Sequence, residues 1–163
     1  DGIKTGFLTV EKYSLASSIK IGERRINAVA SGFETKNSRS RESAKMLTWG
    51  LRRFDSIKVA EKNEIISSLN VWNGKKNKVE VVVAEDIYLT IPKRKKNTIK
   101  VVVEYNGPIQ APIAKGEKLG LLNIYIAGEL KKKFDIFSGE KIQKANIFSR
   151  LLKSINFLVW GDV

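Results

Sequence analysis

A series of short apolar runs fills the chain from Asp55 to about residue 138, and this feature constrains the fold most. Each run has the length of a β-strand, and turn-forming residues separate one run from the next. The runs cover residues 56–61, 65–72, 79–83, 86–91, 98–105, 119–127 and 130–137. The turn signals are Asn73-Gly74, Pro92, Asn106-Gly-Pro108, Lys115-Gly116 and Gly128. This spacing predicts a small sandwich or barrel, and we expect a mostly antiparallel, sandwich-like β domain over residues 55–138.

The residues before Asp55 follow a different pattern. Residues 3–33 are predicted to form two or three strands, including a hairpin with Gly22-Glu-Arg as its turn. From Asn37 to Phe54 the apolar residues recur at helical spacing, and Asn37 or Ser38 can cap the helix. Residues 1–54 are therefore expected to form a mixed α/β section with one helix.

The C-terminal segment, residues 139–163, returns to helical spacing. Between Ile142 and Trp160, apolar side chains share one face, and the opposite face carries lysine, arginine and asparagine without acidic residues. Charge interrupts this run too often for a transmembrane helix. The pattern favours an amphipathic helix in the membrane interface, over residues 142–160. A terminal helix packed on the β domain would have a similar pattern, so this alternative stays open.

Composition limits the chemistry that this sequence can support. The 163 residues include no histidine and no cysteine, which removes the commonest general base, thiolate ligands and the commonest zinc ligand. We therefore expect no metal site and no cofactor. The formal net charge of +13 indicates either attraction to a polyanion or a solvated lysine-rich surface. Nucleic acid is disfavoured because the lysine runs lack interleaved aromatic residues for stacking bases.

One short motif near the start, Lys4-Thr5-Gly6, belongs to the serine acyl-transfer enzymes that bind penicillin. A lysine ammonium supports a site for a substrate that ends in a carboxylate, and a threonine hydroxyl can donate a hydrogen bond to that carboxylate. A glycine leaves room for a peptide backbone against the strand edge. The tripeptide alone would not establish this role, because any three residues recur by chance.

The rest of the chain resembles the low-molecular-mass penicillin-binding proteins, which are serine-type D-alanyl-D-alanine carboxypeptidases. Residues 41–54 resemble the helix that closes the catalytic domain of that family. The family's β-rich second domain is similar to residues 71–75, 84–86, 89–93 and 111–120, and its amphipathic membrane anchor to residues 147–153 and 160–161. The resemblance runs in one order from residue 1 to residue 161. It implies that residues 1–54 are the C-terminal remnant of a transpeptidase-like catalytic domain.

The resemblance also implies site residues. Lys4, Thr5 and Gly6 match the family's third active-site motif, and Arg39 stands where the family places an arginine that helps to hold the terminal carboxylate of the substrate. The sequence departs from the family at Glu11-Lys12, where a small Ala-Gly pair is usual, and at Gly32-Phe33-Glu34, where Gly-Ala-Pro is usual. Both departures border the expected substrate edge.

The nucleophile is not expected in this chain. In the family, S-x-x-K and S-x-N precede K-T-G, whereas here K-T-G begins at residue 4. The later matches are Ser17-Ser-Ile-Lys20, Ser138-Gly-Glu-Lys141, Ser68-Leu-Asn70 and Ser154-Ile-Asn156. Neither S-x-x-K match starts a predicted buried helix, as an activated serine would require. We expect that the N-terminal half of the catalytic domain is missing and that the chain is inactive alone.

The resemblance implies that the parent protein trims the terminal D-alanine from peptidoglycan pentapeptide through an acyl-serine intermediate, and that it binds β-lactams. It implies a location at the periplasmic face of the bacterial inner membrane, held by residues 142–160. The alternative is a non-catalytic basic β module that binds a membrane surface or a polyanion. The basic loops 75–78 and 92–96 fit either that role or plain solvated turns.

Overall fold

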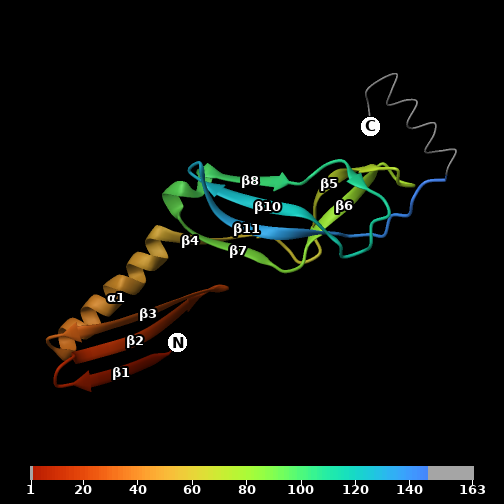
Figure 1. Ribbon diagram of the computed structural model, residues 1–163. Helices are drawn as coiled ribbons and strands as arrows, with labels where there is room; N and C mark the ends of the chain where they lie inside the picture. Colours follow the sequence, from red (N-terminus) through yellow and green to blue (C-terminus); the bar gives the residue numbers. More distant parts are fainter. Residues whose placement is uncertain (1, 147–163) are drawn as a thin grey trace. The chain divides into compact units, whose positions relative to one another are not determined.

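The computed structural model describes residues 2–146 of the chain (Figure 1). These residues divide into two compact units. The N-terminal unit contains residues 2–57 and 90–96, and the β unit contains residues 58–89 and 97–146. The described residues are mostly β with one helix, as expected for residues 1–138, and the predicted C-terminal amphipathic helix lies outside them from residue 147 onward.

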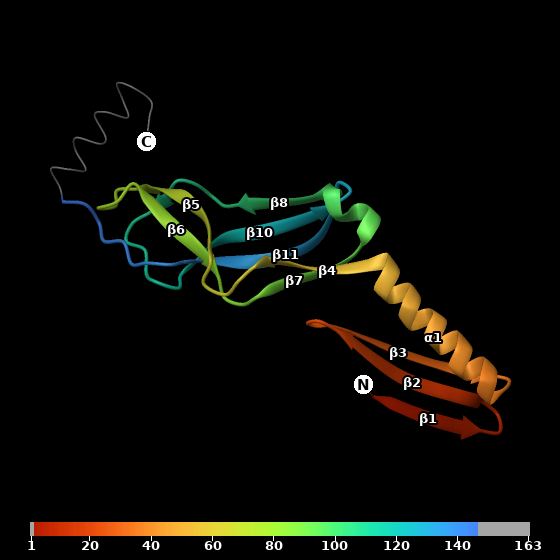
Figure 2. The ribbon, with the colours of Figure 1, turned by 180° about the vertical axis from the view of Figure 1, so that it is seen from behind.

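The N-terminal unit is built on a three-stranded antiparallel sheet in the order β1-β2-β3. Its strands are β1 (Ile3–Leu8), β2 (Lys12–Ile21) and β3 (Arg24–Phe33), and Gly22 enters the turn between β2 and β3 with φ +58°. The helix α1 (Lys36–Arg53) packs on one face of β2 and β3 (Figure 2). On that face Leu15 and Ala28 are buried, and a Cβ on Gly50 would lie 3.4 Å from Ile26.

The cap of α1 is Thr35, which precedes the expected Asn37 or Ser38 by less than one helical turn. The Thr35 backbone is extended, its side chain accepts a hydrogen bond from the Ser38 backbone N–H at 3.0 Å, and the Ser38 hydroxyl lies 3.1 Å from the Thr35 backbone N. This reciprocal pair is a capping box in which serine replaces the usual Glu or Gln. At the other end of the helix, the Arg24 guanidinium donates to the carbonyls of Gly50 and Leu51 at 3.0 and 3.4 Å.

The strands after α1 form two sheets. The predicted seven strands are β4 (Phe54–Ala60), β5 (Ile65–Trp72), β6 (Lys78–Val83), β7 (Ile87–Pro92), β8 (Ile99–Glu104), β10 (Lys118–Ile126) and β11 (Glu129–Ser138). A six-stranded sheet has the order β8-β10-β11-β6-β5-β9, and β4 pairs with β7 in a two-stranded sheet. Two elements were not predicted, namely the two-residue strand β9 (Ile109–Gln110), which pairs in parallel with β5, and the 3₁₀ helix η1 (Lys93–Thr98).

The core of the β unit follows the alternation of its strands. In β6 the buried residues are Val79, Val81 and Val83, with exposed or half-buried residues between them. β10 and β11 contribute Leu122, Ile124 and Ile136, each fully buried. A sheet with one buried face explains why strand periodicity was readable in the sequence.

Residues 139–146 pack into the β unit after β11. Ile142 is 2% exposed, forms an antiparallel bridge with Ile113, and exchanges two backbone hydrogen bonds of 2.9 Å with it. Ala145 is also buried, and its N–H donates to the Asn73 carbonyl at 2.8 Å. The expected anchor segment thus starts with residues that belong to the β core, while residues 147–160 lie outside the described residues. Among residues 2–146, no helix is long and apolar enough to cross a membrane.

Candidate substrate-binding edge

The K-T-G residues lie in β1, at the edge of the N-terminal sheet. Among residues 2–146, β1 pairs only with β2, so its other edge is free to accept another extended backbone. Lys4 pairs with Ala16, and Thr5 pairs with Leu15. All of β1 is solvent-exposed. The motif therefore sits where an extended peptide can pair with the strand.

The two polar residues of the motif point to opposite faces of the sheet. Paired residues share a face, and Leu15 is buried on the face that α1 covers, so Thr5 lies on the α1 face. Lys4 precedes it and therefore lies on the opposite face. Val29, whose partner Ala16 is also the partner of Lys4, is 79% exposed. The lysine face of the sheet is thus uncovered in the described part of the chain.

A side chain at Gly6 would meet its neighbour in β2. A Cβ at this position would lie 2.5 Å from the Ser14 hydroxyl oxygen, and Ser14 is the cross-strand partner of Gly6. The sequence argument assigned Gly6 to room for a substrate backbone. The contact with Ser14 supplies a second reason for glycine, which the sequence did not reveal because it depends on the register of β1 against β2.

Arg39 lies in the first turn of α1 and reaches the same sheet face as Thr5. Its guanidinium carbon lies 5.7 Å from the centre of the Tyr13 ring, a cation–π distance. Tyr13 in turn packs against Phe7, its cross-strand partner, with ring centres 4.7 Å apart. Phe7 directly follows the K-T-G motif in β1. A continuous chain of contacts therefore connects Arg39 to the motif strand.

The charge of Arg39 is not neutralised within the described residues. Its Nε atom is buried without a hydrogen-bond partner, and no acidic side chain of residues 2–146 forms an ion pair with it. The nearby carboxylate of Glu42 is held by Arg41 at 2.8 Å and Lys45 at 3.1 Å. Hydrogen bonds from Arg41 and then Lys45 lower the pKa of Glu42. Arg39 is thus free to bind an anion such as a carboxylate.

The S-x-x-K matches do not form a catalytic pair. Ser17 is buried in β2, where its hydroxyl donates to the Ala28 carbonyl at 3.4 Å. In a strand, Ser17 and Lys20 point to opposite faces, whereas a helix would place them together. Ser138 was expected in a turn and is instead the last residue of β11, buried, with its hydroxyl donating to the Glu140 carbonyl at 2.5 Å.

Tyr13, Phe7 and Ser14 are the site residues that the sequence argument missed. Each acts through a neighbour on another element, so the missing information was the pairing of β1 with β2. The available signal was the aromatic residue on each side of the tight β1–β2 connection, since aromatic pairs are common across hairpins.

The fold is shared with solved penicillin-binding carboxypeptidases. The chain is similar to penicillin binding protein 5 from Haemophilus influenzae, with a TM-score of 0.74 and 30% identity over 86% of this chain and 42% of that chain. It is also similar to the D-alanyl-D-alanine carboxypeptidase DacD from Francisella tularensis, with a TM-score of 0.66 and 27% identity over 89% of this chain and 37% of that one. These similarities define the class of protein.

Sequence comparison gives the family. Residues 54–144 match the family described as penicillin-binding protein 5, C-terminal domain. The chain therefore belongs to the low-molecular-mass penicillin-binding proteins of the D-alanyl-D-alanine carboxypeptidase family, as the resemblance predicted. The D-alanyl-D-alanine carboxypeptidase DacA of Escherichia coli is 29% identical over 159 residues, which are 97% of this chain and 40% of the relative. The chain thus spans about two fifths of the length of the curated relatives that it matches.

Proposed function

We propose that this chain is the C-terminal part of a serine-type D-alanyl-D-alanine carboxypeptidase that trims the terminal D-alanine from peptidoglycan pentapeptide. The observation that carries the proposal is the placement of Thr5 and Arg39 on one face of the sheet, beside the free edge of β1. A substrate backbone lying along β1 would present its terminal carboxylate to a hydroxyl and a guanidinium together.

The proposed roles follow from the chemistry of each side chain. Thr5 donates its hydroxyl hydrogen bond to the substrate carboxylate, and the fork of Arg39 neutralises that carboxylate. Tyr13 holds the guanidinium, so we assign it a positioning role. Lys4, on the other sheet face, supports the electrostatics of the reacting centre. We propose that the nucleophilic serine and its lysine partner belong to the part of the relatives that these 163 residues do not match, so the chain alone neither hydrolyses peptide nor forms an acyl intermediate.

The first test concerns this inactivity. The 163-residue chain is incubated with labelled penicillin and analysed by intact-mass spectrometry. We expect no covalent adduct, because Ser17 and Ser138 lack an activating lysine on the same face. A stoichiometric adduct on either serine would refute the proposal.

The second test adds the part of a relative that this chain does not match. The chain is fused behind the preceding segment of the Haemophilus influenzae relative, and acylation by penicillin and release of D-alanine are measured. In a fusion that acylates, Thr5→Val or Lys4→Ala is expected to slow acylation about 100-fold, as loss of one donor at a reacting centre does. Arg39→Ala should raise KM for the peptide more than it lowers kcat. Lys20→Ala is the matched control and should leave both unchanged.

Location and alternative function depend on the basic and amphipathic segments. Because Ile142 and Ala145 are buried in the β unit, we propose that residues 147–160 hold the protein at the periplasmic face of the inner membrane, where β-lactams and pentapeptide are its ligands. A non-catalytic basic β module for a membrane surface or polyanion is the second candidate, and the exposed Lys93 and Lys96 of η1 and the net charge of +13 favour it. Retention of acylation in the fusion, with loss on changing Thr5, would decide for the carboxypeptidase.

A further inference from the structure

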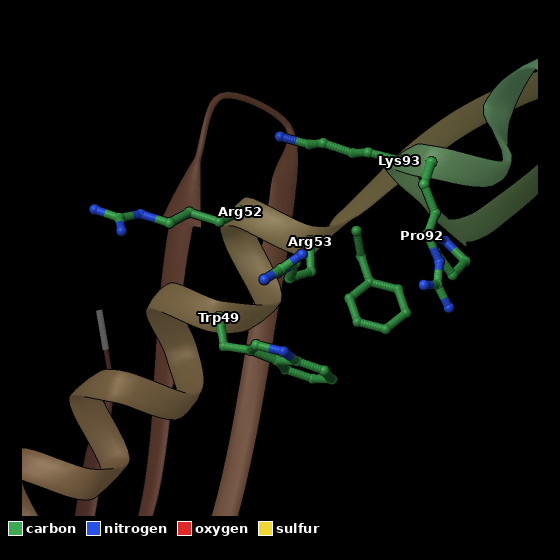
Figure 3. Close-up of a pocket in the computed structure, with 7 residues that line it drawn as sticks. Trp49, Arg52, Arg53, Pro92 and Lys93 are labelled. Carbon is green, nitrogen blue, oxygen red and sulfur yellow. The ribbon is translucent and has the colours of Figure 1, made fainter.

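The N-terminal unit contains a pocket that lies apart from the proposed substrate-binding edge. It lies between the C-terminal end of α1 and the segment that leads from β7 into η1, and its volume is about 430 Å³. Its lining consists of two aromatic residues, one proline and four cationic side chains, namely Trp49, Phe54, Pro92, Arg52, Arg53, Lys93 and Arg94 (Figure 3). No carboxylate lines it.

The four cations of this pocket have no counter-charge of their own. Among residues 2–146, no acidic side chain forms an ion pair with Arg52, Arg53, Lys93 or Arg94. The neighbouring Lys96, by contrast, lies 3.6 Å from Asp55 and is paired. Like charges held close together repel one another, so the pocket favours any anion that enters it.

The helix dipole accounts for only part of this arrangement. Arg52 and Arg53 occupy the last turn of α1, where cations interact favourably with the helix C-terminus. Lys93 and Arg94 lie at the start of η1, so the dipole of α1 does not explain their position in the sequence. Figure 3 also shows the Arg53 side chain extending toward the Trp49 indole, whereas the Arg52 guanidinium points away from it.

Aromatic surface completes the pocket. The Trp49 and Phe54 rings meet edge to face with centres 5.0 Å apart, and Trp49 remains 56% exposed. A large exposed indole beside unpaired guanidinium groups offers a stacking surface next to an anion site.

We propose that this pocket binds the phosphate monoester or diphosphate group of a ligand whose ring or chain covers Trp49. Arginine forks bind carboxylates and phosphates alike, but Arg53, Lys93 and Arg94 together match a group with two or more negative charges better than a single carboxylate. The inference does not rest on the proposed carboxypeptidase activity, because none of the pocket residues belongs to the K-T-G edge.

The test uses the full 163-residue chain with selectively labelled tryptophan indoles. Inorganic pyrophosphate is titrated at constant ionic strength, and the Trp49 indole signal, assigned with Trp49→Phe, reports binding. We expect saturable binding to one site. The double variant Arg53→Gln with Arg94→Gln should bind about 100-fold more weakly, from roughly tenfold for each lost charge-assisted hydrogen-bond partner. The control pair Lys78→Gln with Lys100→Gln changes the net charge equally and should shift affinity by about twofold or less.

Two matched comparisons identify the ligand. Phenyl phosphate and methyl phosphate carry the same charge, so tighter binding of phenyl phosphate reports the aromatic surface. Vesicles with phosphatidic acid, compared with phosphatidylcholine vesicles, separate a lipid phosphate from a soluble one. If the double arginine variant binds phosphatidic acid vesicles less than the wild type does, the phosphate group belongs to a lipid. If its vesicle binding is unchanged while its binding of phenyl phosphate is weakened, the phosphate group belongs to a soluble ligand.

Three results would overturn the proposal. They are absence of saturable pyrophosphate binding, equal affinity in the wild type and the folded double arginine variant, and equal affinity for phenyl and methyl phosphate. Arg53→Lys keeps the charge and removes the fork, so it gives a second measurement if the double variant does not fold. The pyrophosphate affinity of Arg53→Lys should lie between that of the wild type and that of the double arginine variant. If Arg53→Lys binds pyrophosphate as tightly as the wild type does, recognition by the Arg53 guanidinium is refuted.

Discussion

Lys12 donates a hydrogen bond to Glu34, and this ion pair joins the first residue of β2 to the residue that follows β3. The two residues belong to Glu11-Lys12 and Gly32-Phe33-Glu34, the segments where this sequence departs from the pattern of its family. One departure therefore supplies the counter-charge of the other. The two changes form one local contact beside the end of β1.

A double-mutant cycle tests this coupling. Lys12→Ala and Glu34→Ala should each destabilise the chain slightly, and the double variant should cost less than their sum. Both side chains are largely solvent-exposed, so the coupling free energy is expected at about 0.2–1 kcal/mol and should fall in high salt. Denaturant unfolding at low and high salt provides the measurement. Strict additivity at low salt would show that the pair contributes no stability.

The contact of Gly6 with Ser14 predicts a rescue. Gly6→Ala places a methyl group 2.5 Å from the Ser14 hydroxyl oxygen and should cost about 1–3 kcal/mol. In a Ser14→Ala background, the nearest remaining atom is the Ser14 Cβ at 4.0 Å, so the same change should be neutral or slightly stabilising. Thermal unfolding of the four variants checks this. Equal cost in both backgrounds would contradict the register of β1 against β2.

The capping box predicts which residue starts α1. Thr35→Ala should destabilise the N-terminal unit by about 1 kcal/mol, because the Ser38 backbone N–H loses its acceptor. Asn37→Ala is the matched control. Asn37 is exposed inside the helix, where alanine is the better helix former, so its replacement should not destabilise. Circular dichroism of both variants during thermal unfolding gives the comparison. A larger loss for Asn37→Ala would place the cap where the sequence alone suggested it.

The strands of the β unit could be predicted because the alternation of buried and exposed residues is visible within the sequence of each strand. Val79, Val81 and Val83 alternate with more exposed residues, so the periodicity of β6 is visible without knowing its neighbours. The strand β9 has only two residues, too few to show any alternation, and it exists through its parallel pairing with β5. The sequence prediction misplaced the cap of α1 because serine is itself a common N-cap residue. In the structure Ser38 is instead the third helical residue and exchanges capping hydrogen bonds with Thr35.

The candidate site was predictable only in part, for a related reason. Lys4, Thr5 and Gly6 form a local motif, and Arg39 could be placed from family register. The residues that hold them, Tyr13 and Ser14, act across a strand pair. Cross-strand partners depend on register, which one sequence does not specify when the turn is ambiguous.

We expect membrane binding and folding to depend on different residues at the C-terminal end of the chain. A deletion that begins at residue 147 tests this expectation. Ile142 and Ala145 are buried in the β unit and must be kept. Removing residues 147–163 should abolish binding to anionic vesicles, to which each Lys or Arg near the surface contributes about 1 kcal/mol. The thermal midpoint of the β unit should change little.

Ile142→Ala in the full chain is the counterpart of this deletion. It should lower the thermal midpoint, at a cost of about 2–5 kcal/mol, and leave vesicle binding intact. Vesicle sedimentation and calorimetry report the two properties separately. A truncated protein that melts much earlier, together with a full-length chain that ignores vesicles, would favour a terminal helix packed on the β unit.

Residues 140–145 are joined to the loop after β5 at several points. Gly74 bridges Lys144, the Lys75 N–H donates to the Gln143 carbonyl at 2.9 Å, and Lys76 pairs with Glu140, which raises the pKa of Lys76. Any pulling force applied beyond residue 146 must pass through these bonds before it reaches the six-stranded sheet. The load is shared by these backbone contacts and by the buried side chains of Ile142 and Ala145, so tension on a tethered chain is borne first by this segment and its part of the core.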